Sequence, residues 1–142
     1  TGMIIGMSRS TNGAHIARAA LDCIAHQTAD VLEAMRADSG VHFSEVRADG
    51  GAVSNNLLMQ IQANLLQVPV VRPNTQETTA LGTAYLAGLA VEYWNSPTEV
   101  VNLWQMDRRF EPQMDFSQAL ALRAEWHRAI ERARGWNEPG LT

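Results

Sequence analysis

The sequence predicts an α/β fold in which helices alternate with short strands. Two long segments, residues 14–38 and 116–134, repeat apolar side chains at helical spacing. Two shorter segments have strand patterns: residues 43–48 alternate weakly, and residues 68–73 are rich in valine and end in proline. With 142 residues, 46% of them hydrophobic, the chain has the size and composition of one ordinary globular domain. Alternation of this kind is typical of a sheet with helices packed on it.

The start of the chain predicts an extended entry, a turn and a long helix. Residues 2–7, GMIIGM, are a short apolar segment between glycines that favours a strand or an extended entry. Residues 8–13, SRSTNG, have turn chemistry. A helix is then expected from Ala14 to about Asp38, with Ser39 and Gly40 as a stop signal. Its apolar positions are Ile16, Ala20, Ile24, Val31 and Met35.

The middle of the chain predicts a strand, a loop, a helix and a second strand. The strand over residues 43–48 ends at an Asp-Gly-Gly sequence. A helix follows over residues 55–66, and either Ser54 or Asn55 could cap it because a short side-chain oxygen accepts from a first-turn N–H. Residues 68–73 form the next strand, which proline closes. The expected apolar face of the helix consists of Leu57, Leu58, Ile61 and Leu65.

The helix expected over residues 79–93 is apolar around most of its circumference, which predicts burial by neighbours on several sides. It contains Gly82 and Gly88, each of which costs about 1 kcal/mol relative to alanine. A helix that keeps two glycines usually needs close approach to another backbone. Ordinary tight packing and a hinge between domains both explain that need, and the residues alone leave the choice open.

The last third predicts a turn at residues 95–99, a connector or short strand at residues 108–112, and an amphipathic helix over residues 116–134 that ends near Gly135. Only two strands are predicted firmly, and two strands make a marginal sheet. The chain also begins in well-patterned sequence without an initiator methionine. We therefore expect a piece of a longer protein whose other strands lie upstream. The final helix is expected to turn Ala119, Leu122, Trp126 and Ile130 inward.

Charge and composition argue against several classes of function. The net charge is −4 and the pI about 5.5, and the absence of a basic run predicts no nucleic-acid partner. The apolar run at residues 78–91 is too short and too rich in small side chains for a membrane span. The single cysteine, Cys23, excludes an internal disulfide, and no signal-peptide pattern is visible. We expect a cytoplasmic chain without membrane contact.

The titratable side chains show no spacing typical of a metal site and no acid/base pair that can be recognised from the sequence. The four histidines lack ligand spacing, so each is expected to be structural, and Cys23 is expected in the core of the first helix. Asp49 follows a strand beside glycines, where polar residues often line a cleft, and Glu77 precedes the apolar helix. Neither acid has an acid/base partner nearby in sequence. The histidines are His15, His26, His42 and His127.

The glycine-rich segment VRADGGAVSNN, residues 46–56, is the strongest candidate for a binding loop. It lacks the Gly-Lys-Ser/Thr ending of a Walker loop and the spacing of a dinucleotide fingerprint. A tight turn explains the glycines, and so does close approach of the backbone to a planar or phosphate group. The following helix N-terminus favours anions, and the Asn55 amide offers a donor and an acceptor. The residues alone leave turn and ligand contact equally open.

Three stretches of the chain share motifs with one enzyme family. Residues 2–22 match that family's second signature, from GMIIGM into the first helix. Residues 46–66, VRADGGAVSNNLLMQIQANLL, look like the adenosine motif of the actin-like ATPase fold in the form found in glycerol-phosphorylating members. Residues 72–88, RPNTQETTALGTAYLAG, look like the second connecting motif, whose helix lies at an interdomain hinge. Over nearly its whole length the chain thus resembles the C-terminal part of the FGGY family of carbohydrate kinases.

This resemblance implies an α/β fold that is the C-terminal portion of an actin-like ATPase (ribonuclease H-like) domain, with a mixed sheet flanked by helices. Residues 1–142 would be a single partial domain, with the N-terminal domain absent. The resemblance implies that Gly51 and Asn55 contact the nucleotide and that the backbone of Gly50 lies beside them. The implied cofactors are ATP and Mg²⁺, with the metal ligands, the catalytic aspartate and the substrate-binding residues upstream.

The intact enzyme would transfer the γ-phosphoryl group of ATP to the 3-hydroxyl of glycerol, mainly by positioning and charge neutralisation. This chain would supply part of the nucleotide wall and the hinge, would be inactive alone, and is expected in a homo-oligomer. Two alternatives remain: another sugar or polyol as the family substrate, or a non-catalytic oligomerisation or interaction fragment. The second is supported by apolar faces that the missing strands would leave exposed.

Overall fold

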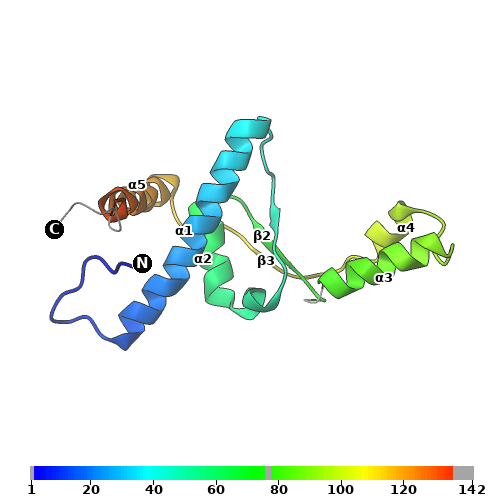
Figure 1. Cartoon of the computed structure of the whole chain (residues 1–142), viewed down its shortest axis with the longest axis horizontal. Coiled ribbons are helices and arrows are strands. Elements are labelled where there is room, and N and C mark those ends of the chain that lie inside the picture. The colour runs from blue at the N-terminus through cyan, green and yellow to red at the C-terminus, as the bar shows by residue number, and fades with distance from the viewer. Residues whose placement is uncertain (1, 76–77, 136–142) are drawn as a thin grey trace.

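The computed structural model describes residues 2–75 and 78–135 and confirms the α/β fold (Figure 1). Helices flank a small mixed sheet whose middle strand pairs on both sides. In chain order the elements are α1 (Gly13–Ser39), β1 (Val46–Arg47), the 3-10 turn η1 (Gly51–Ser54), α2 (Asn56–Leu66), β2 (Val70–Pro73), α3 (Thr78–Ala90), α4 (Pro97–Asn102), β3 (Met106–Phe110) and α5 (Phe116–Ala133).

The sheet has three strands in the order β1-β2-β3. β1 pairs in parallel with β2, and α2 makes the crossover between them. β3 pairs antiparallel with β2, so the possible strand predicted at residues 108–112 is present as Met106–Phe110. The strand predicted at residues 43–48 is shorter than expected, because only Val46 and Arg47 pair with β2.

α1 has the predicted bounds and is capped at both ends. The Asn12 Oδ1 accepts from the N–H groups of Ala14 and His15, and His15 Nδ1 accepts from the Asn12 N–H in return. The helix ends at Gly40, whose φ of 67° is in the left-handed region that glycine adopts readily. Local capping chemistry therefore decides where this helix begins and ends.

The apolar positions predicted for α1 are not the positions that are buried. All five predicted positions are exposed, the four large side chains among them by fractions from 41% to 60%, whereas Ala25, His26 and Ala29 are buried. α2 packs against α1, and the small Ala25 side chain in their shared core lets the two helix backbones approach closely. Cys23, predicted in the core, is only half-buried and accepts from Gln27 Nε2 at 3.3 Å. The four large exposed side chains are those of Ile16, Ile24, Val31 and Met35.

The hydrophobic core lies between α1, α2 and the sheet. On α2 the predicted positions Leu58, Ile61 and Leu65 are buried, and Leu57 is exposed at the first turn. The residues α2 contributes pack with Ala25 of α1 and with strand side chains on the other face. The buried cluster consists of Ala25, Val53, Leu58, Met59, Ile61, Ala63, Leu65, Val70 and Phe110.

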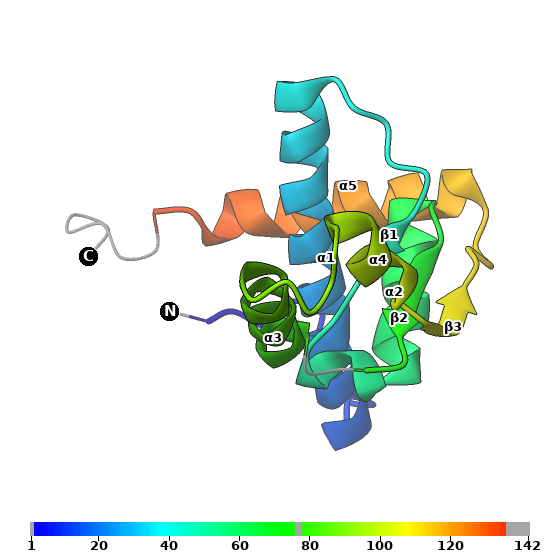
Figure 2. The same cartoon turned by 90° about the vertical axis from the view of Figure 1, so that its right-hand side faces the viewer.

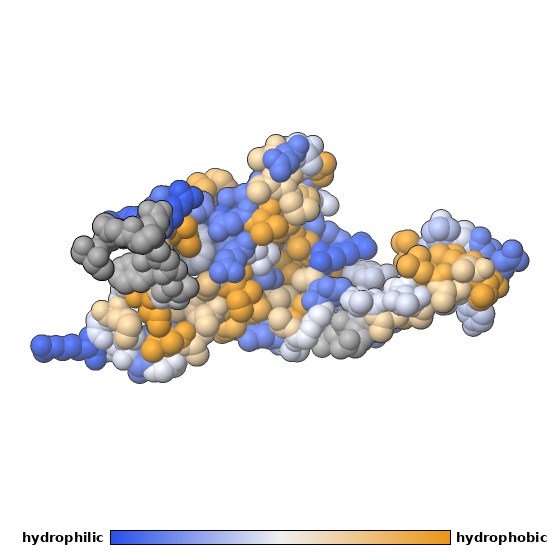
Figure 3. All heavy atoms as spheres, viewed as in Figure 1, coloured by the Kyte–Doolittle hydropathy of each residue, from blue (hydrophilic) through white to orange (hydrophobic). Residues whose placement is uncertain are grey.

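α3 is present, but the prediction that it is buried on several sides was wrong. None of its side chains is buried, and Leu86 is 70% exposed. Figure 1 shows α3 with α4 standing away from the rest of the structure, at the end of the paired strands β2 and β3. Orange apolar atoms are visible over this end of the molecule in Figure 3. A sequence that is apolar on all sides of a helix predicts that neighbours bury the helix, but it does not identify those neighbours.

The two glycines of α3 have different surroundings. A Cβ at Gly88 would overlap the Trp94 indole, which packs against the helix at this point. The Gly88 carbonyl also accepts a hydrogen bond from the Tyr93 N–H at 2.8 Å. A Cβ at Gly82 would meet nothing within 4 Å. Packing of an aromatic ring, rather than of another backbone, therefore accounts for Gly88. The hinge role of this helix stays a prediction.

Two further segments differ from the sequence expectation. Residues 2–7 have no strand pairing with the described residues, so the extended entry, and not the strand, is what the structure has. The turn predicted at residues 95–99 begins the short helix α4, because Ser96 caps it and Pro97 occupies the first turn. Among the residues that the structure describes, no helix combines the length and the apolar character that crossing a bilayer requires.

α5 has the predicted bounds and crosses α1 (Figure 2). Ala119 is buried as predicted, Trp126 is half-buried, and Leu122 and Ile130 are exposed by slightly more than a third. The segment before α5 is held by amide side chains of α2. Gln60 Nε2 donates to the Glu111 carbonyl at 2.8 Å, and Gln67 Nε2 donates to the Met114 carbonyl at 2.9 Å.

Candidate functional site

The glycine-rich loop connects the end of β1 to the start of α2. The Ala48 N–H donates to the Val71 carbonyl at 3.0 Å, which continues the parallel pairing as far as the loop. The chain then turns at Gly50, whose carbonyl accepts from the Val53 N–H at 3.2 Å, and η1 leads into α2. The structure thus places Gly50, Gly51 and Asn55, the three predicted site residues, along one continuous turn at the end of the sheet.

The two glycines of the loop are there for different reasons. Gly50 has φ of 86° and ψ of 174°, a backbone conformation that essentially only glycine adopts. Gly51 begins the 3-10 turn without a positive φ, and a Cβ added there would meet nothing within 4 Å. Nothing in the described chain therefore requires glycine at position 51. Open space above a glycine backbone is the arrangement that lets a flat ligand lie against it.

Asn55 is the N-cap of α2, as one of the two capping alternatives predicted. Its Oδ1 accepts from the N–H groups of Leu57 and Leu58 at 3.0 and 3.1 Å. These first-turn donors are therefore satisfied within the chain and are not free to hold an anion. The amide Nδ2 has no acceptor among the described residues, so the donor half of the side chain is the half left for a ligand.

Asp49 lies where the sequence placed it, at the carboxyl end of β1. Its carboxylate accepts a hydrogen bond from the hydroxyl of Thr78, the first residue of α3. β1 and β2 are parallel, so their carboxyl ends share one edge of the sheet, which is the usual position of ligand sites in α/β folds. The hydrogen bond links the glycine-rich loop to α3. The other acid considered from the sequence, Glu77, lies outside the described residues.

Sequence reasoning missed Arg72, which reaches the loop from β2. Its Nη1 donates to the Val53 carbonyl at 2.8 Å and to Asn56 Oδ1 at 2.9 Å. Its side chain is 11% exposed and forms an ion pair with Asp107. A signal was present in the sequence. That signal is an arginine within an otherwise apolar strand, which requires a polar partner but does not indicate which one.

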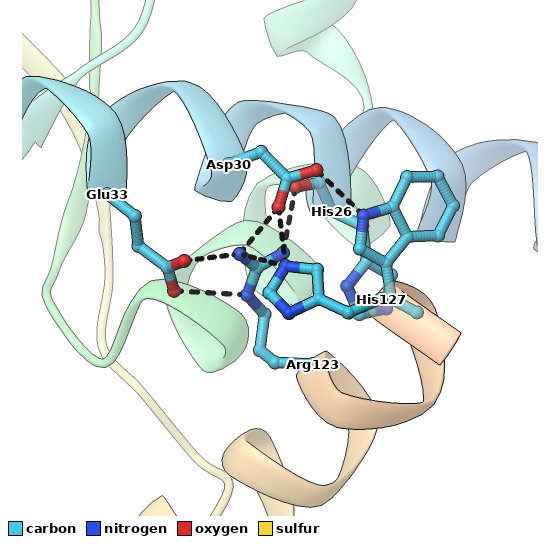
Figure 4. A network of polar contacts seen from close by, with 6 residues as sticks. His26, Asp30, Glu33, Arg123 and His127 are labelled. Atoms are coloured by element: carbon cyan, nitrogen blue, oxygen red, sulfur yellow. Dashed lines mark hydrogen bonds and ion pairs between the residues drawn. The ribbon is translucent and has the colours of Figure 1, made fainter. Parts of the chain in front are cut away.

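A second polar cluster joins α5 to α1 and centres on Arg123 (Figure 4). The guanidinium lies between Asp30 and Glu33, with Nη2 at 2.7 Å from an oxygen of each. Trp126 Nε1 donates to Asp30 at 2.8 Å, and His127 Nε2 lies 3.0 Å from the same carboxylate. Asp30, Glu33 and His127 converge closely enough for a cation. Because the Arg123 guanidinium already hydrogen-bonds both acids, the cluster fits a structural clasp rather than a metal site.

The titration of this cluster reflects its contacts. Burial alone would raise the pKa of Asp30, but the hydrogen bonds from Trp126, Arg123 and His127 outweigh it and hold that pKa below its ordinary value. Burial, and next the Arg123 charge, lower the pKa of His26. The His26 imidazole stacks on the Trp126 indole with ring centroids 5.1 Å apart. His26 and His127 thus have the structural roles that the sequence predicted, and His15 has one in the α1 cap.

A cavity of about 200 Å³ lies at the C-terminal end of α2, the opposite end of that helix from Asn55. Its walls come from α1, α2 and α5 and are mostly apolar, with Phe43, Leu65 and Phe116 among the lining side chains. None of the predicted site residues lines it. Of its charged lining side chains, Arg123 and Glu33 are already paired with each other, so the glycine-rich loop remains the better candidate site.

Comparison with known proteins identifies relatives of the whole fold. The profile of the C-terminal domain of the FGGY family of carbohydrate kinases matches residues 1–91. Glycerol kinase of Herminiimonas arsenicoxydans is 57% identical over 136 residues, and glycerol kinase of Dechloromonas aromatica (strain RCB) is 60% identical over 135 residues. These matches cover 96% and 95% of this chain but only 27% of each relative. The chain therefore spans about a quarter of the length of these curated relatives.

Solved structures give the same answer for the fold. Plasmodium falciparum glycerol kinase with ADP matches with a TM-score of 0.81 and 34% identity, over 92% of this chain and 26% of that protein. Gluconate kinase from Lactobacillus acidophilus matches with a TM-score of 0.72 at 21% identity, over 91% of this chain and 26% of that protein, which supports the fold alone. The predicted portion of an actin-like ATPase domain is thereby confirmed. With more than half of its residues matched by the family profile, this chain belongs to the FGGY family of carbohydrate kinases, within which it corresponds to the C-terminal part.

Proposed function

We propose that this chain forms part of the nucleotide wall of an ATP-dependent glycerol kinase. The observation that carries the proposal is Gly51: no contact or backbone angle in the described chain requires glycine there, and its missing Cβ leaves the backbone open. Gly51 lies in the turn between β1 and α2, whose N-cap is Asn55, at the sheet edge where α/β folds bind ligands. The identity to glycerol kinases, 57% and 60%, supports the choice of enzyme.

The residues present fit a nucleoside in a specific way. The Gly51 backbone offers a flat surface for the adenosine, with the Gly50 turn beside it, and the Asn55 Nδ2 supplies one donor to a base or sugar acceptor. ATP with Mg²⁺ supplies the phosphoryl group and part of its charge neutralisation. Asp49 is engaged by Thr78 and is therefore assigned to holding the loop, not to chemistry. The described residues offer no carboxylate that we would assign as the catalytic base.

In this proposal the chain supplies part of the nucleotide site, and the rest of the protein supplies the catalytic and substrate-binding residues. Residues 1–142 would form one partial domain, and the catalytic aspartate, the metal ligands and the glycerol-binding residues would lie in the remaining three quarters that the relatives contain. The chain alone would be inactive. We place the intact enzyme in the cytoplasm, because its substrates are small intracellular metabolites and the single cysteine of this chain suits a reducing compartment, and we expect it to be a homo-oligomer.

Glycerol is favoured over other substrates by sequence identity rather than by any contact in this chain. The more distant structural neighbours include gluconate and xylulose kinases, at 21% to 22% identity. They show that the same fold serves several sugars and polyols. No residue of the proposed nucleotide wall would distinguish these substrates, since each of them would meet the other side of the cleft.

The test is phosphorylation of glycerol by the full-length protein that contains this sequence, compared with gluconate and xylulose as competing substrates. ADP titration of this chain should be run beside it. Glycerol-dependent ADP formation supports the proposal. Activity on a sugar alone would change the substrate and keep the nucleotide site. Absence of nucleotide binding together with stable self-association of the chain through its exposed apolar side chains would favour the interaction fragment instead.

A further inference from the structure

Arg72 contacts the segment that includes Asn55 on both sides of that residue. One nitrogen, Nη1, donates to the Val53 carbonyl, two residues before Asn55, and to Asn56 Oδ1, one residue after it. The distances are 2.8 and 2.9 Å. The Arg72 guanidinium thus hydrogen-bonds both the end of η1 and the first residue of α2. Among the described residues, no other side chain hydrogen-bonds to both of these elements.

The guanidinium is itself fixed from the sheet. The Arg72 Nε and Nη2 atoms each lie 2.7 Å from Asp107 Oδ2 on β3. The guanidinium carbon, Cζ, lies 5.6 Å from the centre of the Phe110 ring. The side chain is 11% exposed and Phe110 is buried, so the anchor is packed as well as charged. Arginine suits this place because its donors diverge in one rigid plane, whereas a lysine ammonium would be a single point charge on a flexible stem.

From this geometry we infer that Arg72 is a positioning residue for the nucleotide wall: it sets the angle at which the Gly51 backbone and the Asn55 amide meet the nucleotide. The inference rests on the proposed function of that wall and adds a residue to it. Asp107 neutralises the Arg72 charge, so its role is mechanical support rather than attraction of the phosphates. Loss of the two loop contacts should therefore weaken nucleotide binding and leave glycerol binding unchanged.

The opposite strand provides a matched control. Arg108 pairs with Arg72 across β2 and β3 and lies over the same Phe110 ring, at 4.7 Å from its centre. Among the described residues it makes no hydrogen bond to the loop. Replacement of either arginine by methionine removes one charge beside Phe110, but only replacement of Arg72 removes the contacts to Val53 and Asn56.

The experiment compares Arg72→Met, Arg72→Lys and Arg108→Met with the wild-type full-length protein. We expect Arg72→Met to raise the KM for ATP about tenfold with the KM for glycerol within about twofold, Arg72→Lys to recover part of the loss, and Arg108→Met to change neither. KM does not depend on how much enzyme is folded, so partial misfolding does not obscure the result. If Arg72→Met does not fold, the KM values of Arg72→Lys are compared with those of the wild type and Arg108→Met instead.

A second readout does not need activity. Amide hydrogen exchange across residues 50–58 of the nucleotide-free protein should become faster in both Arg72 variants and stay unchanged in Arg108→Met. Parallel increases in the two KM values, or unchanged exchange in this loop, would overturn the role of Arg72 while leaving the kinase assignment intact. A wild-type protein that binds no ATP or ADP would overturn the proposed function and this inference together.

Discussion

Arg123 on α5 donates from Nη2 to Asp30 on α1 at 2.7 Å, across 93 positions of sequence. The same nitrogen bonds Glu33 at 2.7 Å, and Nη1 donates to the His26 carbonyl at 3.1 Å. The arginine side chain is 6% exposed, whereas both carboxylates reach water. The buried guanidinium has hydrogen-bond partners, and water still reaches both carboxylates, so the full desolvation cost of a buried ion pair is avoided. These contacts between α5 and α1 determine how α5 lies on α1.

Arg123→Met should loosen α5 without unfolding the core. The methionine keeps the apolar stem and leaves the two acids in contact with water, so the loss is that of the charged hydrogen bonds. We expect amide exchange in residues 116–133 to accelerate about tenfold, measured by mass spectrometry. Arg128→Met, an exposed change on the same helix, is the control. Equal exchange rates in the two variants would show that the clasp contributes nothing to holding α5.

His26→Phe should reduce the acid sensitivity of the fold. The pKa of His26 is lowered below the ordinary 6.5, so in the unfolded chain the imidazole takes a proton at a higher pH than in the folded one. Its contribution to stability is therefore complete above pH 6.5 and is lost as the pH falls from there through the folded pKa. Phenylalanine keeps the stacking on Trp126 and cannot titrate, and the Nδ1 that it removes has no hydrogen-bond partner.

Melting temperatures of wild type and His26→Phe, recorded between pH 7.5 and 5.5, check this prediction. The wild type should lose more stability over that range than the variant. The exposed His42 gives the control substitution His42→Gln, which should follow the wild-type curve. Identical pH slopes for wild type and His26→Phe would mean that His26 is protonated equally in the folded and unfolded states.

Gly51→Val should impair ATP use far more than glycerol use in the full-length enzyme. A Cβ added at Gly51 meets nothing within 4 Å among the described residues, so the melting temperature should stay within about 2 °C of wild type. The valine side chain would occupy the space proposed for the nucleotide and raise the KM for ATP about tenfold or more. Gly13→Val, at another open glycine, serves as the control. Equal effects on ATP and glycerol would remove Gly51 from the nucleotide wall.

Asn55 has two roles that substitutions can separate. Asn55→Ala removes the helix cap and the proposed nucleotide donor, so it should cost about 1 kcal/mol of stability and weaken ATP binding by about 1 kcal/mol. Asn55→Ser keeps a capping oxygen and lacks the amide donor. Calorimetric ADP titration and thermal melting should therefore show that serine restores the stability but not the affinity. Recovery of both would leave only the cap as the role of Asn55.

Much of the fold could be predicted because the signals are local. Asn12, Gly40 and Asn55 begin or end helices through hydrogen bonds and backbone angles within a few residues, and those patterns are readable along the chain. The turn at Gly50 belongs to the same class. The position of β3 was predicted less firmly, since a five-residue strand with polar side chains becomes a strand through its pairing with β2.

Burial was the part that local patterns misjudged. The apolar side chains of α1 and the whole circumference of α3 were expected inside, and the described residues leave them largely exposed, as the orange areas of Figure 3 illustrate. Helical periodicity identifies a face with apolar character. It does not reveal which neighbour covers that face, and here the small residue Ala25 is the one that shares the core with α2.

The sequence by itself determined the order of helices and strands, the glycine-rich turn and its capping asparagine, because each depends on residues a few positions apart. Only the tertiary structure decided that Arg72 supports that turn from the neighbouring strand, that Arg123 joins α5 to α1, and that glycine at 51 faces open space. These relationships join residues 16 to 97 positions apart, or depend on empty volume, and no pattern along a single chain contains that information.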